Sequence, residues 1–190
     1  MLTAITSHRL RLAMIALLAV LALAGTACSD SSSAAENLPD LGDVPGADGT
    51  AVDGDIAPDF TVDTLDGTGF TLSEHLENDG RPVFLNMWAS WCPPCRAEMP
   101  DIDAAADEHT DVKFVGVAAS DEPASAADFA TSIHIGYTIG FDEHGVVARE
   151  YNIPGLPASY IISADGVIVE KIFGAVTQAQ IDEKLESHFG

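Results

Sequence analysis

Basic residues are scarce in this chain. Its 190 residues include 8 Lys and Arg against 30 Asp and Glu, giving a formal net charge of −22. A protein that binds nucleic acid neutralises phosphates with basic side chains, so this balance excludes a nucleic-acid binder. Cysteine is equally sparse. Three cysteines are too few for a disulfide scaffold and an odd number for a secreted protein.

The apolar content, in contrast, is that of a folded protein. Hydrophobic residues make up 47% of the chain and charged residues 20%, which excludes a wholly disordered or fibrous protein. The length is sufficient for one domain of ordinary size with additional segments. We find no internal repeat, and we therefore expect a single folded domain.

Acidic residues are absent from residues 1–27. Arg9 and Arg11 precede the apolar run Leu12–Ala27, which ends in small residues. A basic start, an apolar stretch and a small-residue end are typical of a secretory signal peptide. A transmembrane anchor is the alternative, but a span needs about 20 apolar residues. We predict that residues 1–27 are a signal peptide.

The sequence Gly25-Thr26-Ala27-Cys28 resembles a bacterial lipobox, in which lipid is attached to the cysteine. Gly25 departs from this pattern, because the third position before the cysteine is usually Leu, Val or Ile. Ordinary cleavage is the competing interpretation, and it would leave Cys28 as an exposed thiol. We expect Cys28 to be lipidated, since this assigns a chemical use to the odd cysteine.

The segment that follows has the composition of a tether. Residues 29–58 contain no Lys or Arg, seven acidic residues, and many Gly, Pro, Ser and Ala. Such a segment repels itself and cannot form a core. We predict an acidic flexible tether over residues 28–56 and a folded domain over residues 57–190.

Strands and helices alternate along the predicted domain. Strands are expected at 60–62, 69–72, 83–88, 112–118, 137–141, 159–162 and 167–173, and helices at 73–78, 92–109, 124–133, 146–151 and from Thr177 onward. The run Val83–Trp88 is almost continuously apolar, as in a central strand covered on both faces. This pattern predicts an α/β fold with a central mixed sheet flanked by helices.

Two cysteines lie where the central strand gives way to a helix. Cys92 opens that helix and Pro93 fits its first turn, where a missing N–H costs nothing. Unpaired N–H groups and the positive end of the helix dipole favour a thiolate at Cys92. Cys95 lies one turn away on the same face and can attack a mixed disulfide formed by Cys92. The spacing predicts a redox-active dithiol/disulfide pair.

Two other uses of this cysteine pair are weaker. A zinc site needs four ligands, and the sequence offers no second cysteine pair or close histidine pair. A purely structural disulfide enclosing two residues would constrain very little chain. We therefore expect no metal and no bound cofactor, the Cys92–Cys95 pair itself carrying the electrons.

Several motifs around these cysteines resemble the TlpA/ResA-like branch of the thioredoxin superfamily. They are Ala57-Pro58-Asp59-Phe60, Trp88-Ala89-Ser90-Trp91-Cys92-x-Pro94-Cys95-Arg96-x-Glu98 and Gly155-Leu156-Pro157-Ala158-Ser159. The resemblance covers about residues 57–190. It implies a thioredoxin fold with an N-terminal β-hairpin extension and a βα-type insert before a cis-proline. Residues 121–135 match an extra element that lies beside the active site.

The resemblance also implies roles for individual residues. Cys92 matches the exposed attacking cysteine and Cys95 the buried resolving one. Pro157 matches a cis-proline beside the active site, and X–Pro is almost the only place where a cis bond is cheap. The backbone of Leu156 can then pair with an incoming peptide strand. Trp91, Pro93 and Pro94 complete the predicted substrate-binding residues.

Glu98 matches an acid found near the cysteines in this branch. It lies three residues after Cys95 on the same helix face, where burial would raise its pKa and let it relay protons for Cys95. The strand position that holds a buried Asp in other thioredoxins is Asn86, which cannot titrate. The alternative is that Glu98 is a solvated helix residue. We interpret His109, His134 and His144 as surface groups.

The combined interpretation is an extracytoplasmic thiol–disulfide oxidoreductase, anchored by lipid to the outer face of the bacterial cytoplasmic membrane. Pro93 and Pro94 add no charge beside Cys92, which favours a reductant over an oxidant. The resemblance implies cysteine-containing protein substrates such as apocytochrome c, and a membrane protein as electron donor. Two alternatives remain: an oxidase of secreted thiols, and a non-enzymatic binding lipoprotein on a thioredoxin scaffold.

The lipid assignment makes a direct prediction. Labelled palmitate should enter the wild-type protein expressed in a bacterial host and be absent from Cys28→Ser, because the thiol is the attachment point. Equal labelling of the two proteins would contradict a lipid on Cys28.

Overall fold

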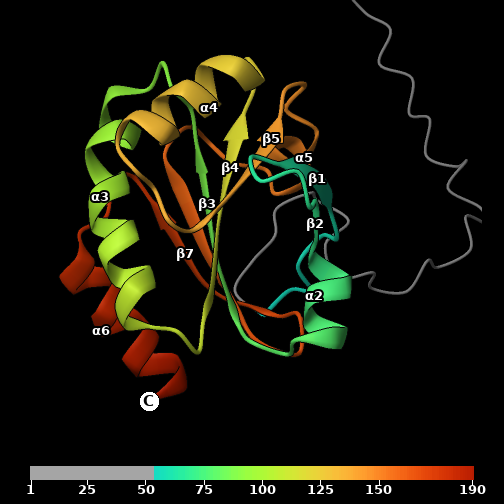
Figure 1. Ribbon diagram of the computed structural model, residues 1–190. Coiled ribbons are helices and arrows are strands. Elements are labelled where there is room, and N and C mark those ends of the chain that lie inside the picture. The colour runs from blue at the N-terminus through green and yellow to red at the C-terminus, as the bar shows by residue number, and fades with distance from the viewer. Residues whose placement is uncertain (1–53) are drawn as a thin grey trace, which may run out of the picture. The chain divides into compact units, whose positions relative to one another are not determined.

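The computed structural model describes residues 54–190, in which helices cover both faces of a seven-stranded sheet (Figure 1). The predictions for the signal peptide, for Cys28 and for nearly all of the tether lie outside these residues. The elements in chain order are β1 (Thr61–Thr64), β2 (Phe70–Thr71), α2 (Leu72–Asn78), β3 (Val83–Trp88), α3 (Pro93–Glu108), β4 (Lys113–Ala119), α4 (Pro123–Ser132), β5 (Thr138–Asp142), α5 (Val146–Glu150), β6 (Ala158–Ile162), β7 (Ile168–Phe173) and α6 (Gln178–Phe189).

Strand β3 lies inside the sheet, between β4 and β6, and every one of its six residues is buried. The strand order is β2-β1-β5-β4-β3-β6-β7. β3 runs parallel to β4 and antiparallel to β6, and β4 runs parallel to β5. The β1–β2, β1–β5 and β6–β7 pairs are antiparallel. The predicted α/β thioredoxin fold with a mixed sheet and an N-terminal hairpin is confirmed.

Alternation along β3 divides the core into two layers. Leu85 and Met87 face the cluster that contains Leu72 of α2 and Val147 of α5. Phe84 faces the opposite cluster, together with Ile102 of α3 and Ile181 and Leu185 of α6. In a strand, residues two apart share a face. Asn86 therefore lies on the α3 side, between Phe84 and Trp88.

The helix ends follow local signals that the sequence carries. Cys92 is the N-cap of α3 and Pro93 its first residue, as predicted. At α6, the backbone N–H of Thr177 donates to Oε1 of Gln180 at 3.0 Å, one half of a capping box. Backbone pairing extends to Gly54, whose N–H donates to the carbonyl of Ile168, three residues before the predicted start of the domain.

The predicted insert forms α4 and lies beside the cysteines. Its Ala126 and Ala130 are buried in the cluster that contains Trp88, Cys92 and Cys95. β5 and α5 follow and add a βα unit before the cis Leu156–Pro157 bond. Among the helices of residues 54–190, none combines the length and hydropathy of a membrane span.

Candidate active site

Cys92 and Cys95 form a disulfide at the N-terminus of α3, with their Cα atoms 5.3 Å apart. Cys92 ends the loop after β3 in an extended conformation, and the backbone N–H of Cys95 donates to its Sγ at 3.4 Å. A helix N-terminus stabilises negative charge through such N–H groups. The predicted source of thiolate stabilisation is therefore present at Cys92.

Cys92 is much less exposed than predicted. In the disulfide form 4% of its surface is accessible, against 0% for Cys95. The reason is packing: Cys92 belongs to a buried cluster with Trp88 and Met99, and Leu156 packs against that cluster from the cis-proline loop. The prediction of an openly exposed attacking cysteine is wrong for the oxidised protein. The predicted buried position of Cys95 is present.

Glu98 lies in α3, three residues after Cys95, and is buried, with 2% of its surface exposed. Its Oε1 accepts a hydrogen bond from Nδ2 of Asn86 at 2.9 Å, and its Oε2 accepts one from the backbone N–H of Val176 at 2.9 Å. Burial raises the pKa of Glu98 to about 7, and the two hydrogen bonds oppose that shift. The alternative of a solvated Glu98 is wrong.

Asn86 also donates from Nδ2 to Oγ of Ser159, at 3.0 Å. A neutral amide with two donor hydrogens can serve both acceptors without adding a charge to the buried site. Sequence reasoning missed Ser159 and Val176. Ser159 lies two residues after the cis-proline, and this closeness could have identified it as a site residue. Val176 contributes only a main-chain N–H, which no side-chain pattern in the sequence indicates.

A groove of about 730 Å³ begins at Trp91, the residue before Cys92. It is lined by Trp91, Ala119, Ser120, Gly145, Ala148, Arg149, Asn152, Ile153, Gly155 and Leu156. Two of the five predicted substrate-binding residues, Trp91 and Leu156, lie in this lining. Pro93 and Pro94 are exposed outside it, and Pro157 is buried. Arg149 and Asn152 were not predicted, because neither belongs to a motif.

The insert holds the loop that leads to Cys92. Oγ of Ser90 donates to Asp121 at 3.0 Å, and Nε1 of Trp91 donates to the carbonyl of Ser120 at 3.3 Å. The Trp91 side chain is 61% exposed despite this bond. On the helix side, the guanidinium of Arg96 lies 4.4 Å from the centre of the Phe129 ring. The Arg96 charge is thereby placed over α4.

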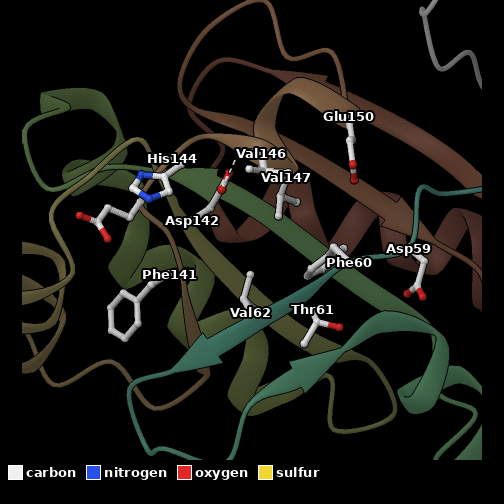
Figure 2. A pocket seen from close by; sticks show the side chains of 11 residues that line it. Asp59, Phe60, Thr61, Val62, Phe141, Asp142, His144, Val146, Val147 and Glu150 are labelled. Carbon is white, nitrogen blue, oxygen red and sulfur yellow. Dashed lines mark hydrogen bonds between the residues drawn. The ribbon is translucent and has the colours of Figure 1, made fainter.

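A second pocket, of about 470 Å³, lies between β1 and α5 (Figure 2). Its lining contains none of the predicted site residues. Asp142 at its edge is committed to capping α5: its Oδ1 accepts from the Val146 N–H at 2.7 Å and its Oδ2 from the Ala148 N–H at 3.0 Å.

One histidine differs from its prediction as a surface group. His109 is half-buried at the end of α3, and its Nε2 lies 2.9 Å from Oδ1 of Asp182 in α6. Together with Glu108 these side chains bring three ligand atoms within 4.8 Å of one another. The His109–Asp182 contact links α3 to α6, and this link explains why the three side chains lie together. His134 and His144 are exposed, as predicted.

Two cysteines that can exchange two electrons, placed at this point of a thioredoxin fold, define the class of the protein as a thioredoxin-like thiol–disulfide oxidoreductase. The chain belongs to the AhpC/TSA family, whose model matches residues 54–171. This class excludes the alternative of a binding lipoprotein that has kept the fold only as a scaffold.

Individual relatives agree with this class. Thioredoxin-like protein YneN of Bacillus subtilis is 34% identical over 140 residues, which cover 70% of this chain and 79% of YneN. The thiol-disulfide oxidoreductase ResA of Geobacillus kaustophilus is 32% identical over 136 residues, covering 70% and 76%. A secreted Mycobacterium tuberculosis disulfide oxidoreductase, described as homologous to Escherichia coli DsbE, has a TM-score of 0.60 and 29% identity, covering 67% of this chain and 95% of that structure.

The buried carboxyl makes stability depend on pH. The pKa of Glu98 is about 7 in the folded protein against an ordinary value of 4.5, so the folded protein binds this proton more tightly than the unfolded chain does. The contribution of this proton to the free energy of unfolding is fully present below pH 4.5 and is lost as the pH rises through 7. Relative to Glu98→Gln, the wild-type protein should lose about 3 kcal/mol of unfolding free energy between pH 4 and pH 8. Urea titrations at several pH values measure this, and parallel curves for the two proteins would contradict it.

Proposed function

We propose that this protein reduces disulfides in cysteine-containing proteins outside the cytoplasm. The observation that carries the proposal is the surroundings of the cysteine pair. A buried carboxyl lies three residues from Cys95, and the guanidinium of Arg96 is stacked over Phe129. Strong oxidants depend on extra stabilisation of the reduced, thiolate form. A buried acid near the pair does the opposite when it is ionised, and this favours a reductant.

The reaction balances as two thiol–disulfide exchanges. The Cys92 thiolate attacks one sulfur of the substrate disulfide, forming a mixed disulfide and releasing the other substrate sulfur as a thiolate. The Cys95 thiolate then attacks Sγ of Cys92, which releases the second substrate thiolate and closes the Cys92–Cys95 disulfide. The substrate gains two electrons and the protein loses two. A dithiol donor must then reduce the pair again.

Glu98 supplies a place for the proton in this cycle. Cys95 has to lose its proton before it can attack the mixed disulfide, and it is fully buried. A carboxyl with a pKa of about 7 is poised to accept or return a proton near neutral pH. The hydrogen bonds from Asn86 and Val176 hold its two oxygens in place through that exchange. Glu98 acts here as the proton relay for Cys95.

The proposed place of action rests on the N-terminal sequence. A signal peptide over residues 1–27, a lipid on Cys28 and an acidic tether would present the domain on the outer face of the bacterial cytoplasmic membrane. The similar M. tuberculosis protein is described as secreted. The disulfide of apocytochrome c, reduced to thiols before haem attachment, is the proposed substrate. A membrane protein that delivers cytosolic electrons is the proposed donor.

An oxidase of secreted protein thiols is the second candidate. The N-cap position of Cys92 favours it, because the Cys95 N–H directed at Cys92 Sγ stabilises a thiolate and thus the reduced form. We place the reductant first because the ionised Glu98 carboxyl opposes this stabilisation of the thiolate.

Removing the resolving cysteine tests the proposed cycle. In Cys95→Ser the first exchange proceeds and the second cannot, so mixed disulfides between Cys92 and extracytoplasmic proteins should accumulate. They are detected as reducible adducts on non-reducing gels, and the Cys92→Ser/Cys95→Ser protein is the matched control.

Thiol alkylation of the wild-type protein in the same cells reports the direction of electron flow. A reductant is held mainly as the dithiol, and a mainly disulfide pool or an absence of adducts would contradict the proposal.

A further inference from the structure

The groove beside Cys92 differs in charge from the rest of the chain. The sequence has 30 acidic residues against 8 basic ones, yet none of the ten residues that line this groove is acidic. Nine of the ten are neutral, and the tenth is Arg149. A cation in a groove without acids is a local positive site on a strongly negative protein.

Arg149 is held in position but its charge is not neutralised. It lies in the last turn of α5, and its Nη1 donates to the carbonyl of His144 at 2.8 Å. Within residues 54–190 no carboxylate lies at ion-pair distance from Arg149, whereas Arg81 is paired with Asp79 and Lys184 with Glu170. The exposed guanidinium keeps further N–H donors in a planar fork that matches a carboxylate.

The other side of α5 has the opposite character. The pocket between β1 and α5 is lined by four acidic residues, Asp59, Asp142, Glu143 and Glu150 (Figure 2). Figure 2 shows the Asp59 and Glu150 carboxylates at its margin. An acidic segment of a partner would be repelled there and accepted in the groove. The two sides of one short helix thus carry charge of opposite sign.

We propose that Arg149 is a specificity-determining residue that selects substrate proteins with an Asp or Glu side chain close to the reactive cysteine. This inference rests on the thiol–disulfide exchange at Cys92 that the proposed function describes. A substrate that lies extended along the Leu156 backbone presents alternate side chains to the groove, spaced about 3.3 Å per residue. The acidic side chain should therefore be favoured on one side of the cysteine and only at particular positions.

Peptides with one cysteine test this proposal. Each peptide carries its cysteine as a 2-thiopyridyl disulfide, whose neutral leaving group is released when Cys92 attacks and is followed by absorbance. Glu, Gln or Lys is placed at each position within four residues of the cysteine. With the reduced wild-type protein we expect one register in which the Glu peptide reacts about fivefold faster than its Gln counterpart, the size of an exposed ion pair. The Lys peptide should be slower than both.

The Glu-to-Gln rate ratio in that register should fall to about 1 in Arg149→Gln. In Arg149→Lys, which keeps the positive charge, the ratio should stay above 1. Arg81→Gln makes the same change far from the groove and should keep the wild-type ratio. A wild-type ratio near 1 at every position would overturn the role of Arg149, and so would an unchanged ratio in Arg149→Gln. If no peptide reacts with the wild-type protein, the exchange chemistry itself fails, and this outcome is distinct from a loss of selectivity.

Discussion

The site depends on the buried carboxyl of Glu98, which holds three elements of the fold together. It projects from α3, accepts the Asn86 amide of β3 on one oxygen, and accepts the Val176 N–H before α6 on the other. A buried carboxyl that is hydrogen-bonded but has no cation beside it keeps a proton to unusually high pH. The burial that packs the helix of Cys92 and Cys95 against the sheet therefore also raises the pKa of Glu98, and the two hydrogen bonds only partly offset that rise.

Charge is separated in the molecule according to use. Arg96 is stacked over Phe129, Arg149 is the one charged residue that lines the groove, and Glu98 is buried in the helix of the cysteines. Most of the acidic residues that give the chain its charge of −22 lie elsewhere, seven of them within residues 29–58. The negative charge thus explains solubility better than it explains recognition.

Local signals made the centre of the site predictable. A continuous apolar strand, Cys92 as a helix cap and Pro93 behind it are short-range features, and the structure keeps each of them. Features that depend on tertiary packing were not predictable. The Val176 N–H reaches Glu98 across 78 residues. Leu156 of the cis-proline loop packs against the cluster that contains Cys92, and Arg149 enters the groove through the orientation of α5. No periodicity or motif encodes those three placements.

The reduction potential of the Cys92–Cys95 pair tests the central claim most directly, because it integrates every influence on the dithiol and disulfide forms. It is measured by equilibrating the purified domain with redox buffers of known potential and quantifying the free thiols. A reductant should give a value near or below that of thioredoxin, about −270 mV. A value near about −120 mV, typical of a strong oxidant, would contradict the account.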